Sequence, residues 1–200
     1  MTAFTTRPEI LGTFGVVTST HWIASAVGMS ILEKGGNAFD AAVATGFVLQ
    51  IVEPHLCGPG GDMPAILYSK KKDKVEVICA QGPAPAGATI EHYTSEGLKL
   101  IPGDGLLATV IPGSFDGWML MLRDYGRLTV RDVLEPAIRY AENGHPILPR
   151  VSATIAGLAD FYRKEWPTSY ETWLPGGSAP EPWSNFKNPV LAETWKRVVA

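Results

Sequence analysis

Two consecutive glycines, Gly35 and Gly36, separate two stretches of helical character, and this corner constrains the fold more than any other feature of the chain. Residues 23–34 before it place apolar side chains at helical spacing. Glycine then readily takes the left-handed conformation that ends a helix. Asn37 follows as the predicted N-cap of a second helix, with Asp40 three residues later in the capping-box position. The sequence therefore predicts two helices joined by a tight turn.

The second helix is built mostly from small residues. It is expected to end before Pro54, because a proline disfavours helical geometry at the residue that precedes it. Small side chains let a helix lie close to its neighbours, so we expect Ala41, Ala42 and Val43 to be largely buried. We also expect both helices to pack on one face of a sheet, as a buried scaffold.

Other elements follow from local patterns. Thr129 and Asp132 predict a second capping box at the start of a helix. Proline, glycine and tryptophan are concentrated in residues 165–188, which predicts a long irregular loop. Strands are expected over residues 15–19, 65–68 and 75–79, with a lysine-rich hairpin tip between the last two, and helices over residues 114–125, 130–143 and 151–163 and from 189 onward.

Composition narrows the class of protein. Of the 200 residues, 46% are hydrophobic and 18% are charged, which is typical of a globular chain. The net charge of −3 gives no basic surface, so a nucleic-acid partner is not expected. Two cysteines, Cys57 and Cys79, are too few for a disulfide framework and have no metal-ligand spacing with the histidines. We expect neither a metal nor a cofactor.

The ends of the chain suggest an expected location. Residues 1–10 lack the apolar run of a secretory signal. No stretch approaches the roughly 20 apolar residues that span a bilayer. The expectation is a cytoplasmic protein with no membrane partner, provided that Met1 is the native start. The last helix shows no stop signal before Ala200, so we expect a single domain over residues 1–200 that is truncated near its end.

Four stretches, in the same order along the chain, resemble the γ-glutamyltransferase (γ-glutamyl transpeptidase) family. The chain has the family's Gly-Gly-Asn-Ala-x-Asp-Ala-Ala-Val-Ala helix with its Glu-Pro, the Gly-x-Gly-Gly loop with its strand, the Pro-Gly-x-x-x-Gly turn and the Tyr-Gly…Pro-Ala…Gly helix. These lie at residues 35–54, 58–68, 111–117 and 125–144. Any one of them is a weak signal, but all four in register are specific.

The resemblance implies an α+β fold, the αββα sandwich of N-terminal-nucleophile hydrolases, here incomplete. Family members are made as precursors that a threonine cleaves into large and small subunits. That threonine then attacks an amide and forms an acyl-enzyme, which water or an amine resolves. The chain resembles only the N-terminal part of the large subunit. Its implied partners are a small-molecule amide substrate and the missing C-terminal half with the small subunit.

No catalytic residue is assigned within this chain. Thr18, Ser19, Thr20 and His21 look like the Thr-Thr-His context of the family nucleophile, but they lie near the N-terminus, where the family has none. Capping a helix is the usual role of Ser or Thr at such a position. The implied nucleophile lies downstream of residue 200.

One departure bears on the substrate. Family transpeptidases carry Asp-x-Arg-Glu-x-Ala-Pro after the second hairpin strand, and the arginine binds the substrate α-carboxylate through its planar pair of donors. This chain has Gln81 at the arginine position and Gly82 at the glutamate position. We assign both as candidate substrate-binding residues and question glutathione as the preferred substrate. The short loop at residues 58–62 also looks more like the amidohydrolase-like branch of the family.

Three functional hypotheses remain. The first is a γ-glutamyltransferase-like enzyme, completed by its C-terminal half, that cleaves or transfers a γ-glutamyl or related acyl group. The second is an acylase or amidohydrolase of the same fold that acts on another amide. The third is a non-catalytic scaffold. A downstream Asp-x-Thr-Thr-His would favour an enzyme, and its absence the scaffold.

Overall fold

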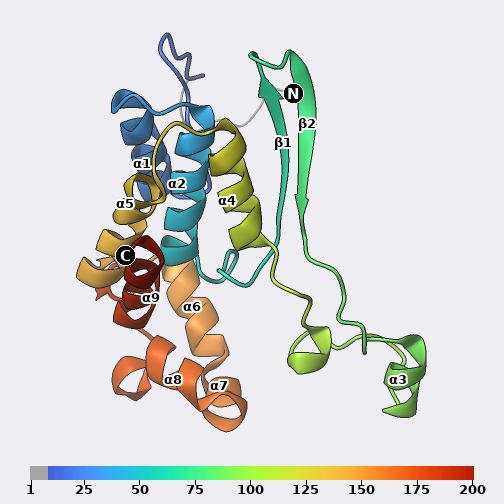
Figure 1. The fold of residues 1–200 in the computed structure, drawn as a ribbon. Coiled ribbons are helices and arrows are strands. Elements are labelled where there is room, and N and C mark those ends of the chain that lie inside the picture. The colour runs from blue at the N-terminus through green and yellow to red at the C-terminus, as the bar shows by residue number, and fades with distance from the viewer. Residues whose placement is uncertain (1–8) are drawn as a thin grey trace, which may run out of the picture.

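The computed structural model describes residues 9–200 and places a helical body beside a β-hairpin (Figure 1). Helices α1 (Trp22–Glu33) and α2 (Ala38–Val52) pack against each other across the glycine corner. Helix α2 also packs against α4 (Ser114–Tyr125) and α5 (Val130–Asn143), and α5 packs against α9 (Pro189–Val199). Helix α2 is therefore the centre of the body.

The predicted capping boxes are confirmed. The side-chain oxygen of Asn37 accepts hydrogen bonds from the backbone N–H groups of Phe39 and Asp40, and the Asp40 carboxylate accepts one in return from the Asn37 N–H. Thr129 and Asp132 form the same reciprocal pair at the start of α5. Both motifs form because each partner lies within one turn of the other.

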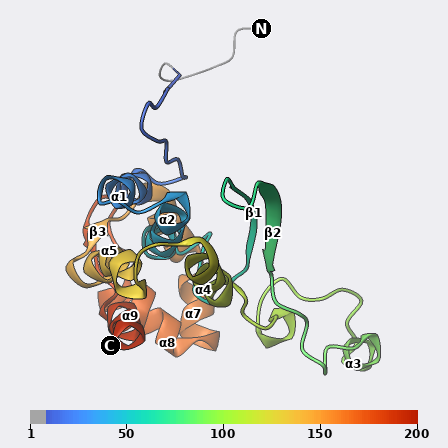
Figure 2. The same ribbon diagram turned by 45° about the horizontal axis from the view of Figure 1, so that its top comes forward.

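Helix α2 is buried as predicted, but its neighbours are helices. Ala41 and Val43 are 2% and 0% exposed, and Ala42 is half-buried. The expected packing of the α1–α2 pair on a sheet face is wrong, because α4 is the helix that lies against the hairpin (Figure 2). Gly117 of α4 makes this close contact possible, since a Cβ there would overlap Ala80 and Met63.

The hairpin is confirmed and is slightly longer than predicted. Strands β1 (Met63–Ser69) and β2 (Lys74–Ala80) pair antiparallel, with Met63 opposite Ala80 and Ser69 opposite Lys74. Leu67 and Ile78 point toward the body and are buried. The other face carries apolar side chains that are 55–81% exposed: Ile66, Tyr68, Val75 and Val77.

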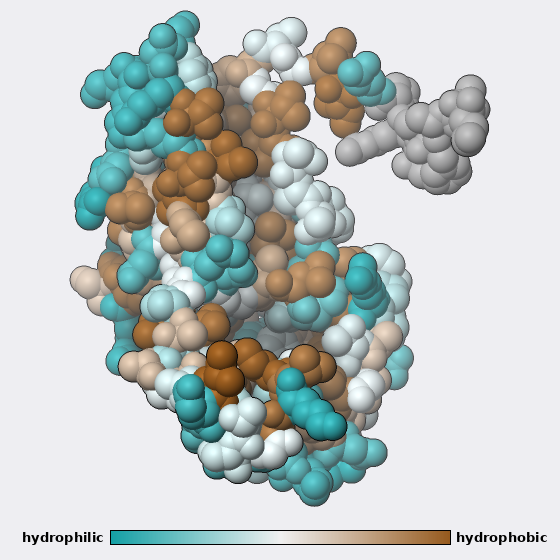
Figure 3. Space-filling view, turned by 90° about the vertical axis from the view of Figure 1, so that its right-hand side faces the viewer, coloured by the Kyte–Doolittle hydropathy of each residue, from teal (hydrophilic) through white to brown (hydrophobic). Residues whose placement is uncertain are grey.

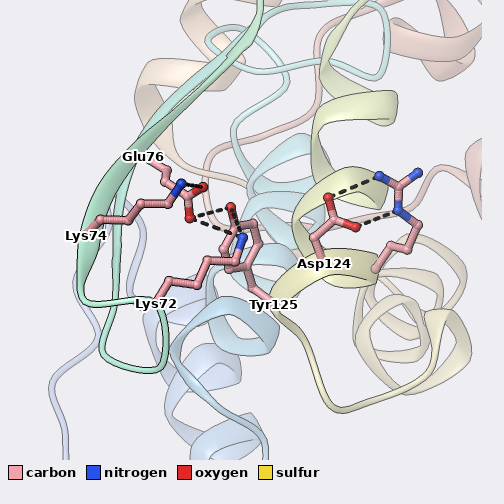
Figure 4. A network of polar contacts seen from close by, with 6 residues as sticks. Lys72, Lys74, Glu76, Asp124 and Tyr125 are labelled. Carbon is pink, nitrogen blue, oxygen red and sulfur yellow. Dashed lines mark hydrogen bonds and ion pairs between the residues drawn. The ribbon is translucent and has the colours of Figure 1, made fainter.

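A polar network joins the hairpin to the end of α4 (Figure 4). The Tyr125 hydroxyl donates to Glu76 over 2.8 Å, and the Lys72 ammonium donates to the same hydroxyl over 3.1 Å. Lys74 and Lys72 form ion pairs with Glu76 at 3.0 and 3.2 Å. These contacts, with that of Lys74 the largest, lower the pKa of Glu76 to about 2.

Three sequence predictions are wrong in detail. Residues 15–19 form no strand, because no strand of the described chain lies beside them to complete a ladder. Residues 151–163 form two helices, α6 (Pro149–Gly157) and α7 (Ala159–Glu165), divided at Leu158. Residues 165–188 are not an irregular loop: they contain α8 (Pro167–Trp173), the 3-10 turn η2 (Pro175–Gly177) and strand β4 (Asn185–Phe186).

A second, small hydrophobic core accounts for the regular structure of residues 165–188. Strand β4 pairs with β3 (His145–Pro146), and Trp173 of α8 stacks on Phe186 with ring centroids 5.7 Å apart. The proline- and glycine-rich segment therefore folds by packing its aromatic side chains. The buried members of this core are Ile147, Val151, Ile155, Leu174 and Phe186.

Residues 83–111, here called the arm, leave the end of β2 and return to the start of α4. The arm contains the short helix α3 (Ile90–Ser95) and the 3-10 turn η1 (Leu106–Ala108). Both ribbon views show it standing away from the body (Figures 1 and 2). The backbone N–H of Ile111 donates to the Pro83 carbonyl over 3.0 Å and closes the arm at its base.

Candidate functional site

The glycine-rich loop, the end of β2 and the start of α4 meet at one end of the hairpin. Backbone N–H groups of Gly113 and Ser114 donate to the Gly61 carbonyl over 3.2 and 3.0 Å. The buried Ser114 hydroxyl donates to the Pro59 carbonyl over 3.1 Å. Two of the stretches that resemble the family are therefore joined directly, although more than 50 residues separate Pro59 and Ser114.

Gln81 and Gly82 lie at this junction, where β2 ends. Gln81 is exposed, and its side-chain oxygen lies 3.5 Å from the Cys79 sulfur, within range of a weak S–H donor. Gly82 has φ of 74°. A Cβ on Gly82 would overlap the carbonyl oxygen of Ile111, because the chain entering α4 crosses the chain leaving β2 there.

The crossing of the two chain segments requires glycine at position 82. A non-glycine residue would be strained at this φ and would also collide with backbone. The space beside its α-carbon is filled by Ile111 and is not open to a side chain from elsewhere. Gln81, in contrast, faces solvent next to the crossing. The assignment of both residues to substrate binding stays a prediction.

A small cavity of about 110 Å³ lies beside the glycine-rich loop. Gln50 of α2 lines it and is only 4% exposed, and its buried side-chain oxygen has no hydrogen-bond partner. Cys57 and Ser114 line the same space. The amide of Gln50 interrupts an apolar helix, which is the sequence signal that could have marked it. The cavity has the size and polarity to hold a few water molecules.

The segment that looks like a nucleophile motif caps a helix. Nδ1 of His21 accepts the Ile23 N–H over 3.1 Å at the start of α1, and the Thr20 hydroxyl donates to the buried Glu53 carboxylate. A nucleophilic threonine needs a base that accepts its proton. Thr20 and His21 are not hydrogen-bonded to each other: the hydroxyl binds Glu53 at the end of α2 and Nδ1 of His21 binds the backbone of α1, so the pair ties the two helices together.

Buried histidines surround this cap. Burial lowers the pKa of His21 against the opposing effect of the Glu53 carboxylate. It also lowers the pKa of His145 to about 4, with a smaller contribution from His21. Burial, and then the Glu53 carboxylate, raises the pKa of the Cys57 thiol. These groups are neutral at pH 7, which disfavours charge-dependent chemistry at this end of α2.

Residues 9–200 carry neither a metal-ligand cluster nor a membrane-spanning helix. These residues bring no group of three or more His, Cys, Asp or Glu side chains together as metal ligands. No helix within the same range combines the length and the hydropathy needed to cross a bilayer.

The protein-family model described as γ-glutamyltranspeptidase matches residues 24–200 of this chain. The chain belongs to the γ-glutamyltranspeptidase family. A glutathione hydrolase-like YwrD proenzyme of Bacillus subtilis is 37% identical over 93% of this chain and 35% of its own length. An oxamate amidohydrolase proenzyme of Klebsiella pneumoniae is 34% identical over 95% of this chain and 36% of its own length. The chain therefore spans about a third of the curated relatives that it matches.

The fold of this chain also matches solved structures. The structure of LmbA2991HD is 52% identical, with a TM-score of 0.94 over 98% of this chain and 34% of its own. The γ-glutamyltranspeptidase of Helicobacter pylori is 30% identical, with a TM-score of 0.87 over 96% of this chain and 55% of that chain. The mixed α/β arrangement described above is the N-terminal part of this family fold.

Proposed function

We propose that this chain is the N-terminal part of the large subunit of a γ-glutamyltranspeptidase-family precursor, belonging to its amidohydrolase-like branch. In the complete protein, a downstream threonine forms an acyl-enzyme with a small amide, and water or an amine resolves it. Residues 1–200 then belong to one domain completed by the C-terminal half and the small subunit. The likeness to proenzymes of this family supports the proposal.

The hairpin carries apolar side chains on both faces, and this supports the αββα sandwich. Its inner face packs on α4, while its outer face carries exposed apolar side chains such as Ile66 and Val77. A strand pair that is apolar on both faces is typical of a sheet covered on both sides. The hairpin would then form part of a middle layer, with the helical body as the outer layer.

Gln81 carries the substrate proposal. It stands where family transpeptidases have a carboxylate-binding arginine, and it lies exposed at the junction of three glycine-containing segments. An amide side chain donates hydrogen bonds but brings no positive charge. The site proposed here therefore selects only weakly for an α-carboxylate, and glutathione is not its preferred substrate.

A substrate pair tests this proposal in the full-length enzyme. γ-Glutamyl-p-nitroanilide and 4-aminobutyryl-p-nitroanilide differ by the α-carboxylate alone. Gln81→Arg should raise the kcat/KM ratio of the first to the second by about 10- to 100-fold, because a charged hydrogen bond contributes about 1.5–3 kcal/mol. Gln81→Ala is the control. The role is wrong if the wild type already prefers the γ-glutamyl compound strongly and Gln81→Ala keeps that preference.

An acylase or amidohydrolase that acts on a non-γ-glutamyl amide is the second candidate. It is favoured by the neutral Gln81 and by relatives that include the oxamate amidohydrolase proenzyme and an acylase ACY 1 proenzyme of Pseudomonas that is 33% identical. Turnover of 4-aminobutyryl or other carboxylate-free amides at rates above the γ-glutamyl compound would select it. A precursor that neither cleaves itself nor turns over any amide would leave the scaffold hypothesis.

A further inference from the structure

The arm, residues 83–111, has no fully buried residue. From residue 81 to residue 113 no residue is buried, and neither α3 nor η1 has a buried side chain. Leu100 and Leu106 are 84% and 88% exposed, and Ile90 is 79% exposed. Large apolar side chains gathered on one exposed segment mark a contact surface.

The arm is nevertheless locally built. Thr89 caps α3 by accepting the His92 N–H over 3.1 Å, and the Tyr93 hydroxyl donates to the Leu107 carbonyl over 2.8 Å. With the base closed between Pro83 and Ile111, these bonds shape the arm. They leave every apolar side chain of the arm at least partly exposed, although burial of such surface is the main favourable contribution to folding. Further burial of the arm would have to come from outside the described residues.

The arm and the outer hairpin face lie on the same side of the molecule. Figure 3 shows hydrophobic side chains gathered in two places on that side, one over the hairpin and one lower down, where the arm lies. The arm continues directly from β2, so one partner could cover both. Such a partner would be apolar, since the exposed hairpin residues Ile66, Tyr68, Val75 and Val77 carry no charge.

We infer that the arm is a docking surface for the part of the precursor that follows residue 200. This inference rests on the proposed function for the existence of that part. The size of the relatives supports this occupant over a second copy: the chain covers only 35% and 36% of two proenzymes, so most of the polypeptide lies outside it. Docking of the arm also holds Gln81, at its base, in a defined position.

Hydrogen exchange of the arm tests the inference, with the full-length precursor compared with the 200-residue chain. The amides of α3 and η1 should exchange at least about 100-fold more slowly in the precursor, because burial restricts local opening. Equal and rapid exchange in both proteins would overturn the inference.

Variants of the full-length protein give a second readout. Leu106→Asp and Leu100→Asp should remove the protection of the arm, while Lys99→Asp, which puts the same charge at an adjacent exposed polar residue, should keep it. Unchanged protection in both leucine variants would contradict docking through these side chains. A 200-residue chain that dimerises, and whose dimer protects the arm as fully as the precursor does, would identify a second copy as the occupant and overturn the inference.

Protection of the arm is independent of turnover. A precursor that turns over no amide but protects its arm would defeat the proposed function and leave the docking surface standing. An active enzyme with a freely exchanging arm would support the proposed function and overturn the docking surface.

Discussion

The α-carbon of Gly82 lies against the carbonyl oxygen of Ile111, where the chain leaving β2 crosses the chain entering α4. No side chain fits between them, and the φ of 74° at Gly82 is itself unfavourable for other residues. The base of the arm and the position of Gln81 both depend on this crossing.

Gly82→Ala should therefore lower the free energy of unfolding by at least about 2 kcal/mol, combining backbone strain with overlap. Gly35→Ala separates the two effects, because Gly35 has φ of 92° but open space around it, and should cost about 1 kcal/mol. Gly157→Ala has neither problem and should change stability by less than about 1 kcal/mol. Denaturant melts of the full-length protein measure all three, and equal effects of the Gly82 and Gly157 changes would contradict the crossing.

Gly46 should tolerate no side chain. A Cβ at this position in α2 would overlap the ring of Trp118 in α4. Gly46→Ala is expected to destabilise the protein by about 1–3 kcal/mol, because overpacking forces neighbours out of their rotamers. The matched control is Gly157→Ala at the end of α6, where a Cβ meets nothing, and it should be neutral or stabilising by up to about 1 kcal/mol. If the two changes had the same effect on the unfolding midpoint, the α2–α4 contact would be wrong.

Stability should fall in mild acid. Burial lowers the pKa of His145 to about 4 and also lowers that of His21. In the unfolded chain these two histidines take up a proton near pH 6.5, whereas in the folded chain they do so only at lower pH. Their contribution to stability is therefore fully present above pH 6.5 and is lost as the pH falls toward 4. His145 alone accounts for up to about 3 kcal/mol over this window.

A histidine swap tests this pH dependence. His145→Gln should flatten the stability curve between pH 6.5 and 4, measured by urea melts at each pH, whereas His92→Gln at an exposed position should leave its slope unchanged. A curve of the same steepness in His145→Gln would show that another group carries the effect.

The 200-residue chain should hydrolyse no amide by itself. The Thr20 hydroxyl is hydrogen-bonded to Glu53 at the end of α2 and Nδ1 of His21 to the backbone of α1, so this segment ties two helices together, and the proposed nucleophile lies downstream of residue 200. Release of p-nitroaniline from γ-glutamyl-p-nitroanilide should match the rate in buffer, and Thr20→Ala should not change it. Turnover above background that Thr18→Ala or Thr20→Ala abolishes would refute this interpretation.

Contacts and elements that depend on residues close together in the chain were predicted from the sequence. The pairs Asn37–Asp40 and Thr129–Asp132 each lie within one helical turn, so the residues that make the contact are the ones that a sequence pattern displays. The hairpin and α4 were predicted for the same reason, from alternation and from helical spacing. The ordered segment at residues 165–188 was not, because its order comes from the stacking of Trp173 on Phe186, a contact between separate elements.

The sequence alone determined the family, through motifs that stand in order along the chain, and it made Gln81 the candidate for the arginine position, which stays a prediction. Only the tertiary structure decided that the glycine loop, Gln81 and the start of α4 share one corner, that Gly82 is required by Ile111, and that His21 caps α1 beside Glu53. These relationships join residues about 30 to 50 positions apart. Their geometry is set by how helices and hairpin pack, which no local pattern of side chains encodes.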